Sequence, residues 1–247
     1  MHALIALLLL AAPKVDTTAL ELGDRAVKLV SHDAGPGPLM VNVHDDENTA
    51  VDAALAVIAK RGGRVVELQH TGARLITFQL ASAKYIADPN RIFTARGVPA
   101  TLHKYGATSK DAEAAVAAFA KALLGKLDPP AGWPLIALHN NTPELSYSIL
   151  SYQPGGADAG EAGEVFVNPK RNANDFLLVT ERKHFDALKA RGFNVVLQSD
   201  KPATDDGSLS VYCGQQKRAY VNVEAQHGHL AEQTEMIDAL YDAVAPK

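Results

Sequence analysis

The segment VNVHDDENT, residues 41–49, places a histidine and a glutamate three positions apart, with two aspartates between them. The apolar run Leu39–Val43 leads directly into His44, and a helical pattern follows Glu47. One interpretation is a polar turn before a helix, because acidic side chains are favoured at a helix N-terminus. The other is a metal site, because imidazole and carboxylate groups at this spacing can bind one ion. These nine residues alone do not decide between the two interpretations.

Two further apolar runs also end in side chains that can do chemistry. His139 follows the run Leu135–Leu138, and Glu224 follows the run Ala219–Val223. Open α/β sheets bind ligands outside the carboxyl ends of their strands, so side chains that follow different strands can meet at one edge. Three strands would then bring two histidines and two glutamates together, and this agreement favours the metal site.

This set of residues is sufficient for a catalytic zinc site. Two neutral imidazoles and one carboxylate commonly provide the three protein ligands, and water occupies the fourth position. His44, Glu47 and His139 are the predicted ligands, and we expect one Zn²⁺ per chain. Zinc lowers the pKa of its water to about 7, and a second carboxylate can accept the proton. Glu224 is the predicted general base.

The segment DPNRIF, residues 88–93, adds groups that can bind a substrate carboxylate. The Arg91 guanidinium can form two parallel hydrogen bonds to a carboxylate, and the Asn90 amide can add another. Asp88 can accept the second N–H of His44 and so fix its tautomer. Asp-Pro-Asn is also typical of a simple turn. We predict that Asn90 and Arg91 bind substrate and that Arg91 takes part in catalysis.

Four motifs follow one another in the order found in a known enzyme family. They stand here as HDDE (44–47), DPNRIF (88–93), HNNT (139–142) and NVE (222–224). Their types and order resemble the aspartoacylase and succinylglutamate desuccinylase group of the zinc carboxypeptidase-like hydrolases, over about residues 38–245. The resemblance implies the ligands, carboxylate anchors and general base named above. It also implies a zinc carboxypeptidase-like, phosphorylase/hydrolase-like fold.

The chain departs from that family's pattern in two places. The family usually has Gly-Asn between the first histidine and the glutamate, where this chain has Asp45 and Asp46. Their negative charge disfavours an anionic group close to the metal. The arginine that polarises the scissile carbonyl in these enzymes has no clear match, and Lys84 is the nearest candidate for that substrate-binding role.

The elements that must position these side chains are apolar runs alternating with helical patterns. Several runs are continuously apolar, as expected of strands covered on both faces. The runs are Ala26–Ser31, Leu39–Val43, Arg64–Leu68, Leu75–Leu80, Leu135–Leu138, Phe176–Thr180, Asn194–Gln198, Ser208–Tyr212 and Ala219–Val223, and the helical patterns lie at 48–61, 108–125, 181–191 and 230–244. We expect an α/β fold with a mixed, mostly parallel central sheet sandwiched by helices.

Two stretches rich in Gly, Pro and Asp, Gln153–Gly163 and Asp200–Gly207, are predicted to be long surface loops. Loops at strand ends often build binding sites. Neither loop separates halves of different composition, so we expect a single catalytic domain over residues 20–247.

The N-terminal segment has the properties of an export signal. An apolar run from Ala3 to Ala12 is long enough for a signal-peptide core and too short to span a bilayer. No Lys or Arg precedes it, and a buried first strand or helix is the alternative. We predict a signal peptide over residues 1–19, a periplasmic or secreted protein, and no membrane association of the mature chain.

The composition restricts the partners of this protein. The chain has 247 residues, 47% of them hydrophobic, and a formal net charge of −4. Lys and Arg are scattered along it, so no basic stripe favours nucleic acid. Its one cysteine, Cys213, excludes a multi-cysteine zinc site and is predicted to be a small buried hydrophobic residue.

The leading hypothesis is an exported zinc-dependent hydrolase that cleaves an amide or peptide bond next to a free carboxylate. Its substrate would be a small peptide or an N-acyl amino acid. Export favours a metallocarboxypeptidase or amidase that acts on cell-wall or other peptides. An N-acyl amino acid deacylase of the aspartoacylase type is the alternative. A non-catalytic peptide-binding module that keeps the metal is a second alternative, although such a module has no chemical need for Glu224.

Overall fold

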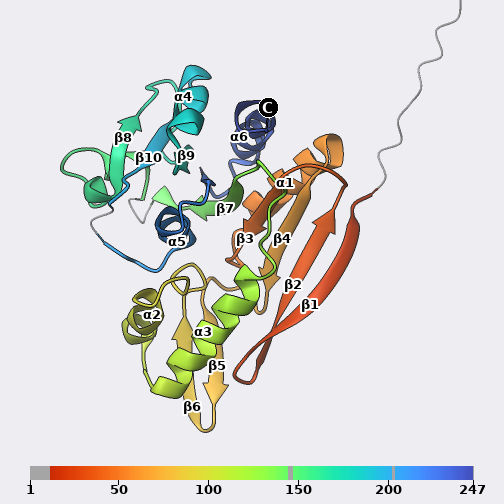
Figure 1. The fold of residues 1–247 in the computed structure, drawn as a ribbon, viewed down its shortest axis with the longest axis vertical. Coiled ribbons are helices and arrows are strands. Elements are labelled where there is room, and N and C mark those ends of the chain that lie inside the picture. Colours follow the sequence, from red (N-terminus) through yellow and green to blue (C-terminus); the bar gives the residue numbers. More distant parts are fainter. Residues whose placement is uncertain (1–11, 144–146, 202–203, 247) are drawn as a thin grey trace, which may run out of the picture.

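A computed structural model of the chain describes residues 12–143, 147–201 and 204–246. Within them, a mixed nine-stranded sheet carries helices on both faces, and a separate two-stranded hairpin projects from one end (Figure 1). The strands are β1 (Lys14–Leu22), β2 (Arg25–Asp33), β3 (Leu39–Asn42), β4 (Arg64–Gln69), β5 (Ile76–Leu80), β6 (Ala83–Ala87), β7 (Leu135–Asn141), β8 (Ala162–Phe166), β9 (Phe176–Val179), β10 (Val195–Gln198) and β11 (Tyr220–Gln226). The helices are α1 (Asn48–Arg61), α2 (Gly97–Tyr105), α3 (Lys110–Leu124), α4 (Arg182–Ala190), α5 (Leu209–Gln215) and α6 (Leu230–Ala243), with short 3₁₀ helices η2 (Ile149–Tyr152) and η3 (Ala159–Glu161).

The large sheet is parallel at its centre and has antiparallel pairs on both sides, with β9 and β10 again parallel to each other. Its order is β1-β2-β4-β3-β7-β11-β9-β10-β8. Strands β4, β3, β7 and β11 are parallel to their neighbours within this group, and antiparallel pairing begins at β2 on one side and β9 on the other. Every residue of β3 and β7 is buried, as expected of strands covered on both faces. The predicted α/β fold with a mixed central sheet between helices is confirmed.

Each face of the sheet has its own hydrophobic core. On one face, α1, α4 and α6 pack through side chains such as Ile58, Phe185 and Ile237, all of them buried. On the other face, α2, α3, α5 and the β5–β6 hairpin pack with side chains such as Leu102 and Phe119. Each such side chain contributes roughly 1.5–3 kcal/mol by burial, so the central strands are held firmly from both sides.

The predicted strand Ser208–Tyr212 is wrong, because this segment forms helix α5. The hydroxyl of Ser208 accepts a hydrogen bond from the backbone N–H of Val211, which caps the first turn of the helix. A short apolar run is ambiguous between a buried strand and a buried helix, and here the N-cap serine was the distinguishing signal. Cys213 is buried within this helix, and burial raises the pKa of its thiol to about 12.

The N-terminal strand was not predicted, because most of its side chains are exposed and no apolar run marks it. Strand β1 pairs antiparallel with β2, from Lys14 opposite Asp33 to Leu22 opposite Arg25. Residues 1–11 of the predicted signal peptide lie outside the described residues, and its predicted end at residue 19 falls inside β1. Export stays a prediction.

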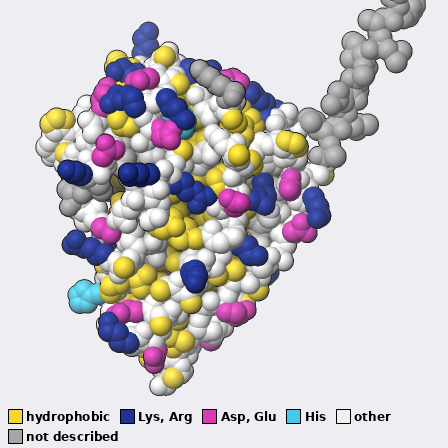
Figure 2. Space-filling model, viewed as in Figure 1, with side chains coloured by type: hydrophobic (Ala, Val, Ile, Leu, Met, Phe, Trp, Pro, Cys, Tyr) yellow, Lys and Arg dark blue, Asp and Glu magenta, His cyan; other side chains and the backbone are white. Residues whose placement is uncertain are grey.

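Two further features bear on the expected partners. No helix in the described ranges is both long and apolar enough to cross a membrane. On the face shown in Figure 2, basic and acidic side chains are interspersed. The absence of nucleic acid and membrane partners stays a prediction.

Candidate metal centre

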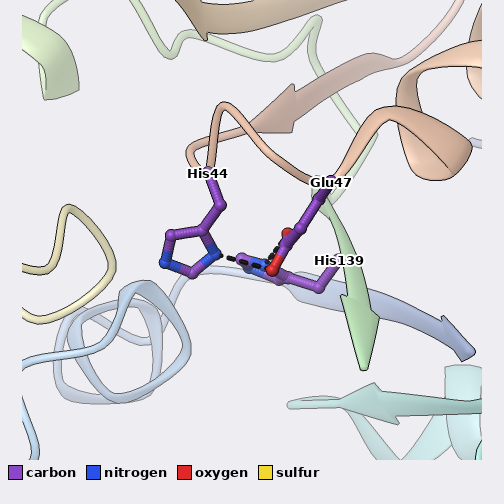
Figure 3. A group of neighbouring side chains, drawn as sticks. All are labelled: His44, Glu47 and His139. Atoms are coloured by element: carbon purple, nitrogen blue, oxygen red, sulfur yellow. Dashed lines mark hydrogen bonds and ion pairs between the residues drawn. The ribbon is translucent and has the colours of Figure 1, made fainter. Parts of the chain in front are cut away.

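The three predicted metal ligands meet at the carboxyl ends of β3 and β7 (Figure 3). His44 lies in the turn after β3, Glu47 directly precedes α1, and His139 lies inside β7, which is three residues longer than predicted. The Nδ1 atoms of His44 and His139 lie 2.9 and 2.8 Å from the two carboxylate oxygens of Glu47. One potential ligand atom from each residue lies within 4.8 Å of the others, and all three residues are buried.

Local structure explains why HDDE presents two ligands to one point. The backbone N–H of Glu47 donates to the carbonyl of His44, which closes a tight turn between the strand and the helix. The Oδ1 atom of Asn140, from β7, then accepts a hydrogen bond from Ala50 in the first turn of α1. This Ala50 N–H also donates to the backbone carbonyl of Glu47, so Asn140 adds a second acceptor at the helix N-terminus and ties α1 to the strand that carries His139.

Asp88 occupies the position predicted for it beside the first ligand. Its Oδ1 atom lies 2.9 Å from Nε2 of His44, on the side of the ring away from Glu47. Burial lowers the pKa of His44, but the carboxylates of Glu47 and Asp88 outweigh this effect and raise it to about 9. Burial alone would raise the pKa of Glu47, and the two histidines instead hold it well below its usual range. In the metal-free protein, a proton on His44 therefore balances these carboxylates.

The donor set fits a zinc ion. Both Nδ1 atoms face the Glu47 carboxylate, which leaves the Nε2 atoms to outer partners, namely Asp88 for His44 and, at 3.4 Å, the Asn90 amide for His139. Such partners are usual around metal-binding histidines, because they fix the tautomer and the orientation of the ring. Two imidazole nitrogens and one carboxylate are a common catalytic zinc set.

Glu224 lies beside the ligands without joining them. It is directly opposite His139 in the pairing of β11 with β7, and it is 3% exposed. The amide nitrogens of Asn141 and Asn222 donate to its two carboxylate oxygens at 3.2 and 3.1 Å. Burial, with a contribution from Glu47, raises the pKa of Glu224 to about 8, although the two amides act in the opposite direction. A carboxylate in this condition can accept and return a proton near neutral pH.

One cavity of about 570 Å³ is lined by Glu47, His139 and Glu224 and by the predicted substrate-binding segment. Arg91 lines it, with Nε 3.4 Å from Asp206 Oδ2 and Nη1 donating to the backbone oxygen of Asn90. The Asn90 side chain is used inside the protein, since its Oδ1 accepts from the backbone of Leu209. Both predicted residues therefore lie at the cavity, and their role in binding a substrate carboxylate stays a prediction.

The two predicted loops form part of the cavity wall. Asp158 and Glu161 come from the first loop, and Thr204 and Asp206 come from the second. Sequence composition had marked both segments only as polar and irregular, and the structure brings them to the same cavity.

Lys84 does not line this cavity, and its predicted role is corrected. It lies exposed on β6 next to the buried Tyr85, because successive side chains of a strand point to opposite faces. A different cation, Arg74, lies beside the ligands with Nη1 2.6 Å from Glu47 Oε1. Arg74 belongs to the irregular segment between β4 and β5, which carries no periodic signal, so sequence reasoning missed it.

Two tyrosines were also missed. Tyr147 and Tyr152 line the cavity, and their hydroxyl oxygens lie 2.7 Å apart. Burial raises the pKa of both phenols, which keeps them neutral. Both rings pack edge-on against the buried Phe176 ring, so the aromatic wall that they give the cavity is anchored in the core.

Neither models of known protein families nor curated protein sequences match this chain. Among solved structures, it is similar to an aspartoacylase family protein from Mesorhizobium loti, with 16% identity, a TM-score of 0.45, and coverage of 96% of this chain and 69% of that chain. It is also similar to the product-bound ectoine utilization protein from Ruegeria pomeroyi, with 15% identity, a TM-score of 0.46, and coverage of 96% and 70%.

Proposed function

We propose that this protein is a zinc-dependent hydrolase that cleaves an amide bond next to a free carboxylate. One observation carries the proposal. The His44, Glu47 and His139 group, the separate buried carboxylate of Glu224 and the guanidinium of Arg91 all belong to one site, and its cavity of about 570 Å³ can hold a small substrate. A ligand set, a base that is not a ligand, and a carboxylate anchor are together the parts that this reaction needs.

Each residue has a defined task. Bound zinc supplies a Lewis acid and lowers the pKa of water. Glu224 accepts a proton from the attacking water and passes it to the nitrogen of the leaving amine. Arg91 binds the substrate carboxylate. Arg74 provides positive charge beside Glu47, where it can stabilise the negative charge that develops on the carbonyl oxygen of the substrate.

Two substrate classes carry a free carboxylate next to the scissile amide, namely N-acyl amino acids and peptides cleaved at their C-terminus. Export through the apolar N-terminal segment is part of the proposal and would favour peptides outside the cytoplasm, including those of the cell wall. Cell fractionation of the full-length chain tests export separately from chemistry. A protein that stays in the cytoplasm would favour the N-acyl amino acids.

The test combines metal analysis with a substrate screen. Purified protein should contain close to one zinc per chain and should hydrolyse members of at least one substrate class, with loss of activity in a chelator and recovery on adding zinc. Each substrate is paired with its carboxyamide derivative, which should be hydrolysed poorly. Binding of a peptide by the wild-type protein without any turnover would instead identify a binding module, and hydrolysis unaffected by chelation would refute the role of the metal.

A further inference from the structure

Arg74 reaches the metal site on a segment with little internal structure of its own. Residues 70–75 connect β4 to β5 and contain neither helix nor strand. Within the described ranges, no backbone–backbone hydrogen bond outside the regular elements involves this segment. Something else must hold it, because an unrestrained loop would spread its side chains over many positions.

Asp45 supplies the missing contacts. Its Oδ2 atom accepts hydrogen bonds from the backbone N–H groups of His70 and Gly72, at 2.6 and 2.7 Å. Hydrogen bonds to a charged acceptor are stronger than those between neutral groups. Asp45 lies directly after His44 and two residues before Glu47, so the turn that presents two metal ligands also holds the segment that carries Arg74.

The geometry points to Asp45 as a positioning residue: it holds residues 70–74 so that the Arg74 guanidinium stays beside Glu47 and over the cavity. This inference rests on the proposed function for its catalytic consequence, but not for its structural part. It also gives a reason for one departure from the family pattern. A glycine after the first histidine could not anchor this segment, and here the aspartate and Arg74 belong to one arrangement.

Each charged group in this arrangement has a partner: Arg74 pairs with Glu47, and Asp45 accepts two backbone hydrogen bonds. Arg74 has a side chain 43% exposed, and it lines the cavity while its guanidinium pairs with Glu47. The carboxylate of Asp45 is 14% exposed and points away to the backbone of residues 70–72. Asp45 therefore acts on the site through the position of Arg74, and its own charge is taken up by two N–H groups.

The structural part is tested by hydrogen exchange, which needs neither substrate nor metal. In Asp45→Ala, the amides of His70 and Gly72 should exchange roughly 10- to 100-fold faster, because each loses a charge-assisted hydrogen bond. Asp45→Asn keeps an acceptor oxygen and should restore part of the protection. Asp46→Ala is the matched control, since Asp46 Oδ1 has no hydrogen-bond partner in the described residues. It should leave exchange in residues 70–74 unchanged.

The catalytic part is tested by combining variants. Asp45→Ala should lower kcat about 10- to 100-fold with KM and zinc content nearly unchanged, and it should add little to the loss caused by Arg74→Ala. Unchanged exchange in Asp45→Ala, or losses that multiply in the double variant, would overturn the inference while leaving the hydrolase proposal intact. If the wild type hydrolyses nothing, the proposed function fails, and the exchange result still decides whether Asp45 holds the segment.

Discussion

Replacing Glu224 with glutamine separates a general base from a metal ligand and from a merely structural residue. The glutamine amide is nearly isosteric, but its NH₂ group would face one of the two donors that now serve Glu224, Asn141 and Asn222. Asn222 can resolve this conflict, because its Oδ1 atom has no hydrogen-bond partner in the described residues. Turning its amide over presents an acceptor, so the variant should fold and, with all three ligands untouched, keep its zinc.

Turnover should nevertheless fall steeply. A positioned acid–base group contributes on the order of 10²–10⁴-fold to the rate, which corresponds to roughly 3–5 kcal/mol in the activation barrier. Substrate affinity should change little, because Glu224 handles a proton and does not anchor the substrate. Zinc content, substrate affinity and kcat measured on one preparation of Glu224→Gln check this expectation.

The same substitution should also change the free energy of unfolding of the metal-free protein. The pKa of Glu224 is about 8 in the folded protein, against an ordinary value of 4.5. Because the folded-state value is the higher one, the unfolded chain loses this proton first as the pH rises, and stability falls between about pH 4.5 and 8. Glutamine does not ionise. Relative to the wild type, metal-free Glu224→Gln should therefore gain roughly 3–5 kcal/mol of stability between pH 4.5 and 8.5.

Chemical denaturation of chelator-treated protein at pH 5 and pH 8.5 measures this difference. Loss of zinc from Glu224→Gln would show that Glu224 is a ligand. Unchanged turnover would remove it from the mechanism. A stability difference between variant and wild type that is the same at both pH values would show that Glu224 does not carry the raised pKa on which this reasoning depends.

Three further predictions concern the neighbouring charges. Zinc must displace the proton from His44, whose pKa is about 9 in the metal-free protein, so zinc affinity should rise about tenfold per pH unit below that value. Competition with a chelator at several pH values measures this, and a flat profile would contradict it. Arg91→Lys should lower kcat/KM at least about tenfold on substrates with a free carboxylate and have little effect on their carboxyamide derivatives, because a bidentate fork becomes a point charge. Lys84→Ala should leave kcat/KM within about twofold of wild type, whereas Arg74→Ala should lower it by about 10²–10³-fold; equal effects would refute the exchange of roles between these two residues.

The convergence of the candidate metal ligands could be predicted from the sequence because local patterns carry it. His44, His139 and Glu224 each directly follow a mostly apolar run, and these runs form buried parallel strands at the centre of the sheet. Parallel neighbours present these ends at one edge, so the residues had to meet. Helix α1 could also be predicted, from Asn48 to Arg61, because its apolar periodicity and the glycine that follows it are local signals.

Tertiary structure alone decided which cation and which loops complete the site. Arg74 comes from an irregular segment whose path depends on hydrogen bonds to Asp45, and no periodicity announces such long-range contacts. Lys84 does not line the cavity, because it lies on the exposed face of β6, and the adjacent Tyr85 packs into the hydrophobic core. Asp206 engages Arg91 only after two distant segments fold against the same edge. Local propensity determines where strands and helices form, but the position of an irregular segment is determined by its partners, which are scattered along the chain.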